Sequence, residues 1–261
     1  MQKANPYHYG VVILLLVILV LPLAATLLYA LSTDWSSLLP SGLTLHWFSY
    51  LWTNSRFLTA LYHSLFVCVG ALLLSCLLIL PTLFVIAYRF PKLGSVMNVL
   101  VLLPFAIPPI ISSVGLLQVY SKPPFDMTGT PWILMGCYFT IALPFIHRTL
   151  SNGLQSINLH DLMDSAHLLG ASTFKAALFV LLPNLRKSII VALLLSFSFL
   201  IGEFVFANIL VGTRYETVQV YLNNMSNESG HFTSAIVISY FAVVLIISLI
   251  TNAFTRHGGT S

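Results

Sequence analysis

Few residues in this chain have the types and spacing that chemistry would need. Glu203 is the most notable, because the run Gly202-Glu203-Phe204 lies inside a stretch of apolar residues long enough to cross a membrane. An ionisable side chain at membrane depth is costly and usually faces a bundle interior or a water-filled path. Glu203 is therefore a candidate pathway residue. The equal alternative is a structural carboxylate that is hydrogen-bonded to a neighbouring helix.

Motifs of the common enzyme classes are absent from the sequence. Neither His-Glu-x-x-His nor Gly-x-Ser-x-Gly occurs, and the eight histidines are mostly isolated. The phosphate-binding pattern Gly-x-x-x-x-Gly-Lys is missing too, so we expect no ATPase activity in the chain alone. Cys68, Cys76 and Cys137 lie in apolar stretches without metal-ligand spacing. The sequence therefore predicts neither an enzyme nor a metal site.

The composition is that of a membrane protein. Of 261 residues, 58% are hydrophobic and 7% are charged, whereas globular domains average about 45–50% apolar and about 25% charged residues. The mean hydropathy is +0.94. The net charge of +4 is spread over scattered Lys and Arg residues, which favours loop anchoring over nucleic-acid binding.

Six segments are apolar and long enough to span a bilayer, which takes about 20 residues. They are roughly Tyr9–Ser32, Tyr62–Tyr88, Ser95–Tyr120, Pro131–Leu150, Ser188–Val211 and Phe232–Phe254. The first resembles a signal peptide, but its apolar run is long and lacks a cleavage site, so we expect a retained helix. Pro104, Pro108 and Pro109 predict a kink or break in the third. The predicted fold is an all-α integral membrane protein, with residues 1–261 forming a single domain.

The distribution of basic residues predicts which side of the membrane each loop occupies. With the N-terminus inside, eight of the 11 Lys and Arg residues fall on the cytoplasmic side: Lys3, Arg89, Lys92, Arg148, Lys175, Arg186, Lys187 and Arg256. Cytoplasmic loops of membrane proteins carry such an excess. Both termini are therefore expected in the cytoplasm.

The stretch of about 151–187, between the fourth and fifth spans, predicts a helix, a turn and another helix on the cytoplasmic face. Leu159, Leu162, Met163, Ala166 and Leu169 fall at helical spacing and form one apolar stripe. An interfacial helix lying on lipid would carry Lys and Arg on its polar face. The acidic and histidine residues found there instead favour docking to a partner protein: Asp161, Asp164 and His167.

Caps and breakers set the expected ends of these two helices. Asn158 is a candidate N-cap, and Asp161 follows in the first turn. Gly170 can supply the left-handed turn that ends the first helix. Ser172 can cap the second helix, which Pro183 is expected to stop before the fifth span begins.

The same segment resembles the EAA loop of binding-protein-dependent permeases of ATP-binding-cassette (ABC) importers. The run Asp164-Ser165-Ala166 is followed by three residues, Gly170, nine residues and then Val180-Leu181-Leu182-Pro183. That spacing matches the family pattern of Glu-Ala-Ala, Gly and Ile-x-Leu-Pro. Three residues depart from it, because Asp164 replaces Glu, Ser165 replaces Ala, and Asn158 stands where many members have Pro. The resemblance extends from about Tyr62 to Asn252.

The resemblance implies a bacterial inner-membrane, multi-pass subunit that does no chemistry itself. A coupling helix between spans four and five would fit a cleft on an ABC ATPase dimer, and that partner would bind the ATP and Mg. Further implied partners are a second, non-identical permease and a periplasmic substrate-binding protein. The residues carried over are Asp164, Ala166, Gly170 and Pro183, with Leu162 and Met163 as apolar anchors.

The stretch from Glu203 to Leu222 is similar to the polyamine, phosphonate and ferric-ion branch of the family. A carboxylate suits a polyamine cation, so the sequence favours a polyamine. The alternatives are 2-aminoethylphosphonate and ferric ion. A secondary transporter is a further alternative, but such proteins usually show inverted repeats with matching broken helices, and here only the third span is interrupted.

Overall fold

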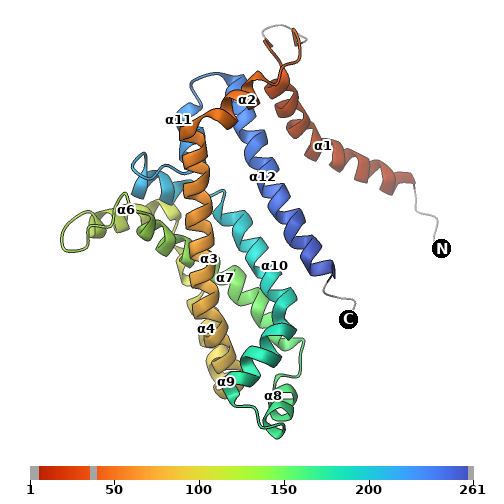
Figure 1. The fold of residues 1–261 in the computed structure, drawn as a ribbon, viewed down its shortest axis with the longest axis vertical. Coiled ribbons are helices and arrows are strands. Elements are labelled where there is room, and N and C mark those ends of the chain that lie inside the picture. The colour runs from red at the N-terminus through yellow and green to blue at the C-terminus, as the bar shows by residue number, and fades with distance from the viewer. Residues whose placement is uncertain (1–5, 36–39, 258–261) are drawn as a thin grey trace. The chain divides into compact units, whose positions relative to one another are not determined.

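Helices account for nearly all the regular structure in the described residues, 6–35 and 40–257, of this computed structural model (Figure 1). A single antiparallel bridge joins Ser32 to Leu43. The helices, in chain order, are α1 (Pro6–Leu31), α2 (His46–Thr53), α3 (Ser55–Arg89), η1 (Pro91–Leu93), α4 (Gly94–Leu100), α5 (Leu103–Ala106), α6 (Pro109–Tyr120), α7 (Pro131–Gln155), α8 (Leu159–Leu168), α9 (Thr173–Ala176), η2 (Ala177–Leu181), α10 (Leu182–Leu200), η3 (Ala207–Val211), α11 (Val218–Met225) and α12 (Gly230–His257).

The chain forms two compact units. The first comprises Met1–Thr59 and Tyr221–Ile246, and the second comprises Ala60–Val220 and Ile247–Ser261. The single-domain description of the whole chain stays a prediction. The predicted positions of the two termini involve residues 1–5 and 258–261, which lie outside the described residues.

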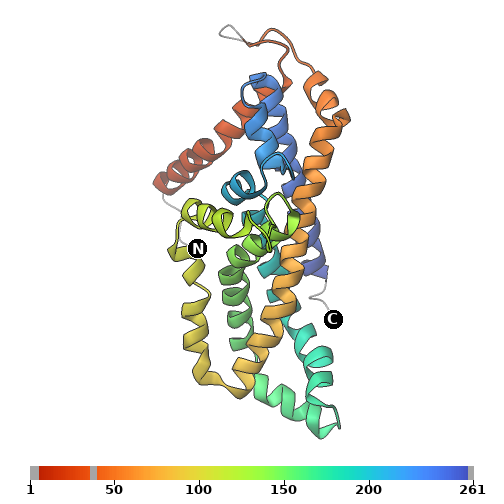
Figure 2. The ribbon, with the colours of Figure 1, turned by 90° about the vertical axis from the view of Figure 1, so that its left-hand side faces the viewer.

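Among the described residues, five helices are long and apolar enough to cross a membrane, or six if a bent pair is counted as one span. The predicted all-α membrane fold is therefore confirmed. The pair consists of Pro91–Ala106 and Pro109–Tyr120, which meet at an angle of 86°. Figure 2 shows α6 crossing the direction of α4 at this break. The break falls at Pro108 and Pro109, where the sequence predicted it, because proline removes a backbone donor and its ring obstructs the preceding turn.

The fifth span differs from the expected Ser188–Val211. One continuous helix runs from Thr173 to Leu200 and passes through Pro183, which does not stop it. The π-helical turn η2 comes just before this proline, and a π turn holds one residue more than an α turn. Asn184 Nδ2 donates to the Val180 carbonyl at 2.7 Å, which satisfies one of the carbonyls near the proline. The helix ends at Leu200, and after a short break the chain forms a second piece that ends with η3.

In the second unit, α7 and α10 pack closely against each other. Ile146 and Leu150 of α7 are fully buried, and Leu185 of α10 is nearly so. A Cβ atom at Gly153 would lie 2.7 Å from the Ser188 Cβ, so only glycine fits there. Small residues permit such close approach of spanning helices. This contact joins α7, which leads into the 151–187 segment, to α10, which leaves it.

In the first unit, polar and aromatic side chains fix the end of α1. His231 is buried, its Nδ1 lies 2.8 Å from the Tyr29 carbonyl, and its ring stacks on Tyr29 with centroids 4.1 Å apart. The Ser32 hydroxyl lies 3.1 Å from the same nitrogen, and Trp47 Nε1 donates to the Ser32 carbonyl. By contrast, no residue in the most apolar stretch of α1 is buried within the chain, as expected of a helix whose apolar surface meets lipid or another subunit.

Candidate functional site

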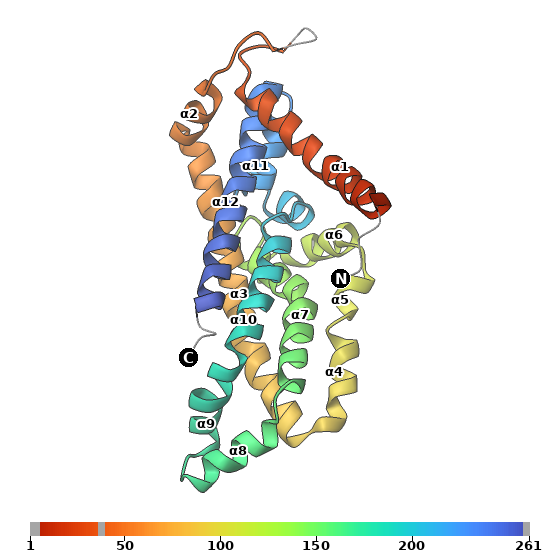
Figure 3. The same cartoon turned by 90° about the vertical axis from the view of Figure 1, so that its right-hand side faces the viewer.

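The 151–187 segment forms the predicted helix and turn. α8 covers Leu159–Leu168, and Gly170 follows it with φ +82°. The Ala171 N–H donates to the Ala166 carbonyl at 3.0 Å, which closes the left-handed turn. Ser172 caps α9 by accepting from the Lys175 N–H at 3.4 Å. Figure 3 shows α8 and α9 at the end of the second unit where α3 turns into α4.

One face of α8 packs on the second unit itself. Leu159, Met163 and Ala166 of the predicted stripe are buried against their own chain, whereas Leu162 is only half-buried. Leu169 was expected on the same stripe, but it lies at the end of the helix with φ −85° and ψ 9°, and it is 88% exposed. The stripe therefore ends where the helical geometry ends.

An exposed apolar tip stands at the end of α8. Leu168 is 89% exposed and Leu169 88%, and Phe174 on α9 is 76% exposed. We call these three residues the α8 tip. Exposed polar and charged residues accompany them on α8, including Asp161 and Asp164. Sequence reasoning missed the tip, because it placed Leu169 on the apolar stripe of the helix and gave Leu168 and Phe174 no role.

The coupling residues implied by the resemblance occupy different environments. Asp164, Gly170 and Pro183 are exposed, so other molecules can reach them. Met163 and Ala166 face their own chain and would act by positioning α8 rather than by touching a partner. Their role in coupling stays a prediction, as does that of the half-buried Leu162.

The N-terminus of α8 lacks the expected side-chain cap. Asn158 occupies the N-cap position with φ −79° and ψ 83°, but its side chain makes no capping hydrogen bond. Asp161 lies in the first turn, where a negative charge favours the helix dipole. At the other end, His167 Nε2 lies 3.4 Å from the Thr173 hydroxyl, which links α8 to α9.

Glu203 is engaged by the backbone of the residues that follow it. Its Oε1 accepts from the Phe206 N–H at 2.8 Å, and its Oε2 accepts from the Ala207 N–H at 3.1 Å. The Tyr138 hydroxyl donates to the Glu203 carbonyl oxygen at 3.4 Å. These contacts are those of a helix cap. They satisfy free N–H groups at the start of the second helical segment of the fifth span, the segment that ends with η3. They favour the structural alternative, and the pathway role of Glu203 stays a prediction.

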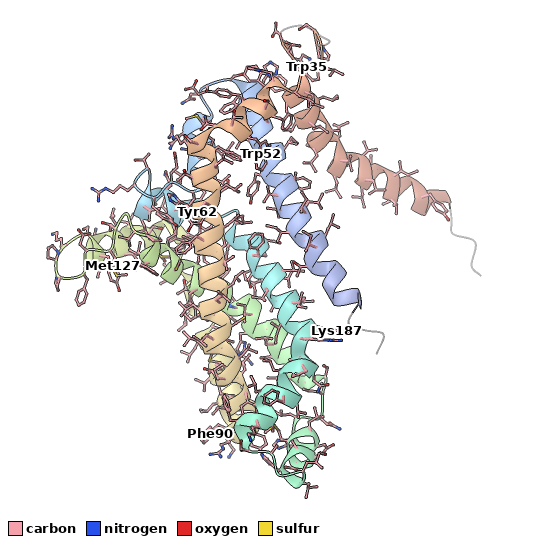
Figure 4. All side chains as sticks on the ribbon, in the orientation of Figure 1. Trp35, Trp52, Tyr62, Phe90, Met127 and Lys187 are labelled. Carbon is pink, nitrogen blue, oxygen red and sulfur yellow. The ribbon has the colours of Figure 1, made fainter. Side chains whose placement is uncertain are left out.

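The segment after η3 is held against α3 by contacts that the sequence did not reveal. The ring of Tyr215 stacks on His63 with centroids 3.8 Å apart, and His63 Nδ1 lies 3.0 Å from the Glu216 carbonyl oxygen. The Val218 N–H donates to the Ser64 hydroxyl at 2.8 Å. Burial, with a smaller contribution from nearby Tyr62, raises the pKa of Tyr215 to about 12, so Tyr215 stays neutral at physiological pH. Figure 4 labels Tyr62 on α3 near this contact.

Among the described residues, no group of three or more His, Cys, Asp or Glu is arranged to hold a metal ion. Cys68, Cys76 and Cys137 are free thiols, and Cys68 and Cys137 are buried.

The long apolar helices of this fold define an integral membrane protein. Residues 79–257 match the family described as binding-protein-dependent transport system inner membrane component. The match covers more than half of the chain, so the chain belongs to this family of multi-span inner-membrane permeases. The resemblance carried by the EAA-like spacing is thereby confirmed.

Named relatives fall in two transport systems. A Salmonella typhimurium protein is called "Putative 2-aminoethylphosphonate transport system permease protein PhnV"; it is 29% identical over 95% of this chain and 93% of its own length. Its Salmonella paratyphi A counterpart is 32% identical over 73% of this chain and 71% of its own length. The Escherichia coli K12 spermidine/putrescine transport system permease protein PotC is 24% identical over 82% of each chain.

Solved structures share the fold. A chain of a bacterial ABC transporter involved in the import of the acidic polysaccharide alginate aligns with a TM-score of 0.75 and 13% identity, covering 97% of this chain and 99% of its own. A chain from the bacterial alginate ABC transporter, in complex with an alginate pentasaccharide-bound periplasmic protein, aligns with a TM-score of 0.69 and 17% identity, covering 98% and 96%. The family match and the named relatives, together with this shared fold, show that the chain is a permease subunit of an ABC importer.

Proposed function

We propose that this permease forms a substrate pathway with a second, non-identical permease, and that an ABC ATPase dimer drives it. ATP and Mg would bind to the ATPase, and a periplasmic binding protein would deliver the substrate. Both termini and the 151–187 segment would lie in the cytoplasm, in agreement with the excess of Lys and Arg there.

The exposed α8 tip carries the coupling part of this proposal. Leu168 and Leu169 expose nearly their whole side chains at a turn that Gly170 fixes. Burying a leucine side chain contributes about 1.5–3 kcal/mol, so the pair favours a protein partner over water. Transmission of a conformational change requires a contact whose free energy differs between two states. A short helix packed on its own unit and tipped with leucines can provide such a contact.

We infer that the substrate is a small amine that also carries an acidic group, with 2-aminoethylphosphonate first. The PhnV relatives support this choice, because they are more similar to this chain than PotC is. The contacts of Glu203 argue against a polyamine rather than for an aminophosphonate. Both carboxylate oxygens already accept backbone hydrogen bonds, which weakens the argument that Glu203 binds a polyamine cation. A polyamine remains the second candidate, on the strength of the similarity to PotC.

Uptake in vesicles that contain this permease and its three kinds of partner tests the substrate. We expect ATP-dependent uptake of labelled 2-aminoethylphosphonate that excess unlabelled compound blocks and excess spermidine does not. Spermidine uptake without 2-aminoethylphosphonate uptake would instead establish the second candidate. A vesicle preparation lacking the binding protein serves as the control.

A further inference from the structure

A polar cavity of about 470 Å³ lies at the N-terminus of α8 in the second unit. Its size falls within the roughly 300–1,000 Å³ typical of small-molecule sites. Residues of α3, α4, α7 and α8 line it, and amide side chains are common among them: Asn98, Asn152, Gln155 and Asn158.

One wall of the cavity offers donors for an anion. His147 is only 3% exposed and lines the cavity, and its ring has no hydrogen-bond partner among the described residues. Arg148 is next to it and has no ion-pair partner in the described part of the chain. The uncapped N-terminus of α8 opens on the same cavity at Asn158 and His160. The Leu159 N–H at this end donates to the Ile157 carbonyl, and the Asp161 carboxylate supplies the negative charge that the helix dipole favours.

The cavity also has an acceptor for a cation. Asp161, in the first turn of α8, is the carboxylate that lines it, and it makes no ion pair with another described residue. A simple anion would be repelled by this carboxylate. A molecule that carries both an anionic group and an ammonium group satisfies Arg148, His147 and Asp161 together.

We propose that this cavity binds a small zwitterion from the side of the membrane where α8 lies, with its anionic group at His147 and Arg148 and its ammonium group at Asp161. Occupancy slows transport, because the ligand joins the N-terminus of α8 to α3 and α7 and so favours one arrangement of the proposed coupling helix. The sidedness and the choice of 2-aminoethylphosphonate as ligand rest on the proposed function. The transported solute would then limit its own import.

Equilibrium binding to the purified complex, without the binding protein, tests the site apart from transport. The probes are 2-aminoethylphosphonate, methylphosphonate (anion only) and ethylamine (cation only). We expect 2-aminoethylphosphonate to bind most tightly and Arg148→Gln to weaken it about tenfold or more. Asp161→Asn should lower the affinity for 2-aminoethylphosphonate to that of methylphosphonate. The same substitution should not weaken the binding of methylphosphonate itself.

Arg186→Gln is the matched control, because Arg186 is an exposed arginine of α10 that does not line the cavity. The Arg186→Gln complex should bind 2-aminoethylphosphonate as tightly as the unaltered complex does. Arg148→Lys, which keeps the charge, provides a second variant if Arg148→Gln fails to assemble. Equal binding by all variants, or no preference for the zwitterion, would overturn the proposal whether or not 2-aminoethylphosphonate is transported.

Inhibition is then measured in proteoliposomes whose ATPase subunits face outward. We expect external 2-aminoethylphosphonate to lower the rate of ATP hydrolysis. Arg148→Gln should raise the concentration needed for half-inhibition about tenfold or more. Each variant is compared with its own rate in the absence of the ligand. Membranes without phosphatidylethanolamine exclude competition from a headgroup of the same chemistry. Adding that lipid shows whether the headgroup occupies the site as well. Undiminished hydrolysis at saturating ligand would overturn the regulatory part.

Discussion

At the scale of single residues, the contacts of Glu203 are those of a helix cap. Its two oxygens hold the N–H groups of Phe206 and Ala207, at the point where the fifth span breaks. A capping contact of this kind typically stabilises a protein by about 1 kcal/mol. The cap follows the end of α10 at Leu200.

Replacing Glu203 by glutamine separates the capping role from a pathway role. Glu203→Gln leaves one acceptor oxygen in place of two, so we expect a less heat-stable complex whose uptake per assembled complex changes less than about twofold. Glu203→Ala, which removes both acceptors, should be less stable still. Glu228→Gln is the control, since Glu228 is an exposed acidic residue. A tenfold loss of uptake at normal assembly would instead support a pathway role.

The turn at Gly170 provides a second test at this scale. Nothing lies within 4 Å of a Cβ placed there, so a side chain would clash with no other residue. It would be destabilising only because the backbone has φ +82°. That strain costs about 1–2 kcal/mol for most residues and less for asparagine. We expect Gly170→Val to insert normally but to lose uptake, and Gly170→Asn to retain more of it. Gly10→Val, also in open space but without a positive φ, is the control; equal uptake by both valine variants would contradict the account.

Local signals in the sequence were enough to predict the turn after α8. Gly170 forms the turn and Ser172 caps α9 through contacts with residues only a few positions away, so their residue types were enough to indicate these roles. The capping bond of Glu203 was not predicted, because it depends on where α10 ends, and the continuous apolar run of the fifth span does not indicate that end. Asn158 was predicted to cap α8, but its side chain makes no capping bond.

At the scale of helices, the path through Pro183 is the main departure from expectation. A proline inside a helix removes a hydrogen bond and clashes with the carbonyl four residues before it, at a cost of about 3 kcal/mol or more. Here that carbonyl belongs to Phe179, inside the π turn Ala177–Leu181. The wider turn lets one helix continue from Thr173 to Leu200. The residues of this turn are all apolar, so the sequence pattern is the same for an α turn and for a π turn and did not indicate which would form.

Removing this proline should change the register of the helix rather than break it. We expect Pro183→Ala to relax the π turn, to rotate α9 by about 100° relative to α10, and so to misplace the α8 tip. Uptake should fall at least about fivefold, while the complex keeps or gains thermal stability. Pro22→Ala, which removes a proline from inside α1, is the matched control. Full uptake by the Pro183 variant would show that the π turn has no part in coupling.

At the scale of the whole molecule, hydropathy was sufficient to predict the spans. Six apolar segments were predicted, and five long helices and one bent pair are found, with the break at the expected prolines. The bounds were less well predicted, because α3 and α7 extend beyond their apolar segments as helices. The short helices α2 and α11 were missed, since eight residues give little periodicity.

The orientation of the molecule can be tested directly by labelling. A cysteine introduced at Lys175 should react with a membrane-impermeant thiol reagent only from the cytoplasmic side, and one at Glu228 only from outside. Both positions are exposed in their own units, so accessibility does not limit the reaction. The reverse pattern would overturn the proposed placement of α8.

Cross-linking at the α8 tip tests the central claim, that this permease is driven through α8, most directly. A photoreactive side chain replaces Leu169, and irradiation of the assembled complex is followed by mass spectrometry. Leu19 of α1, which is 68% exposed, carries the same group as control. The account predicts an adduct between position 169 and the ATPase subunit, and none from position 19. Adducts of position 169 with lipid or the periplasmic binding protein alone would contradict it.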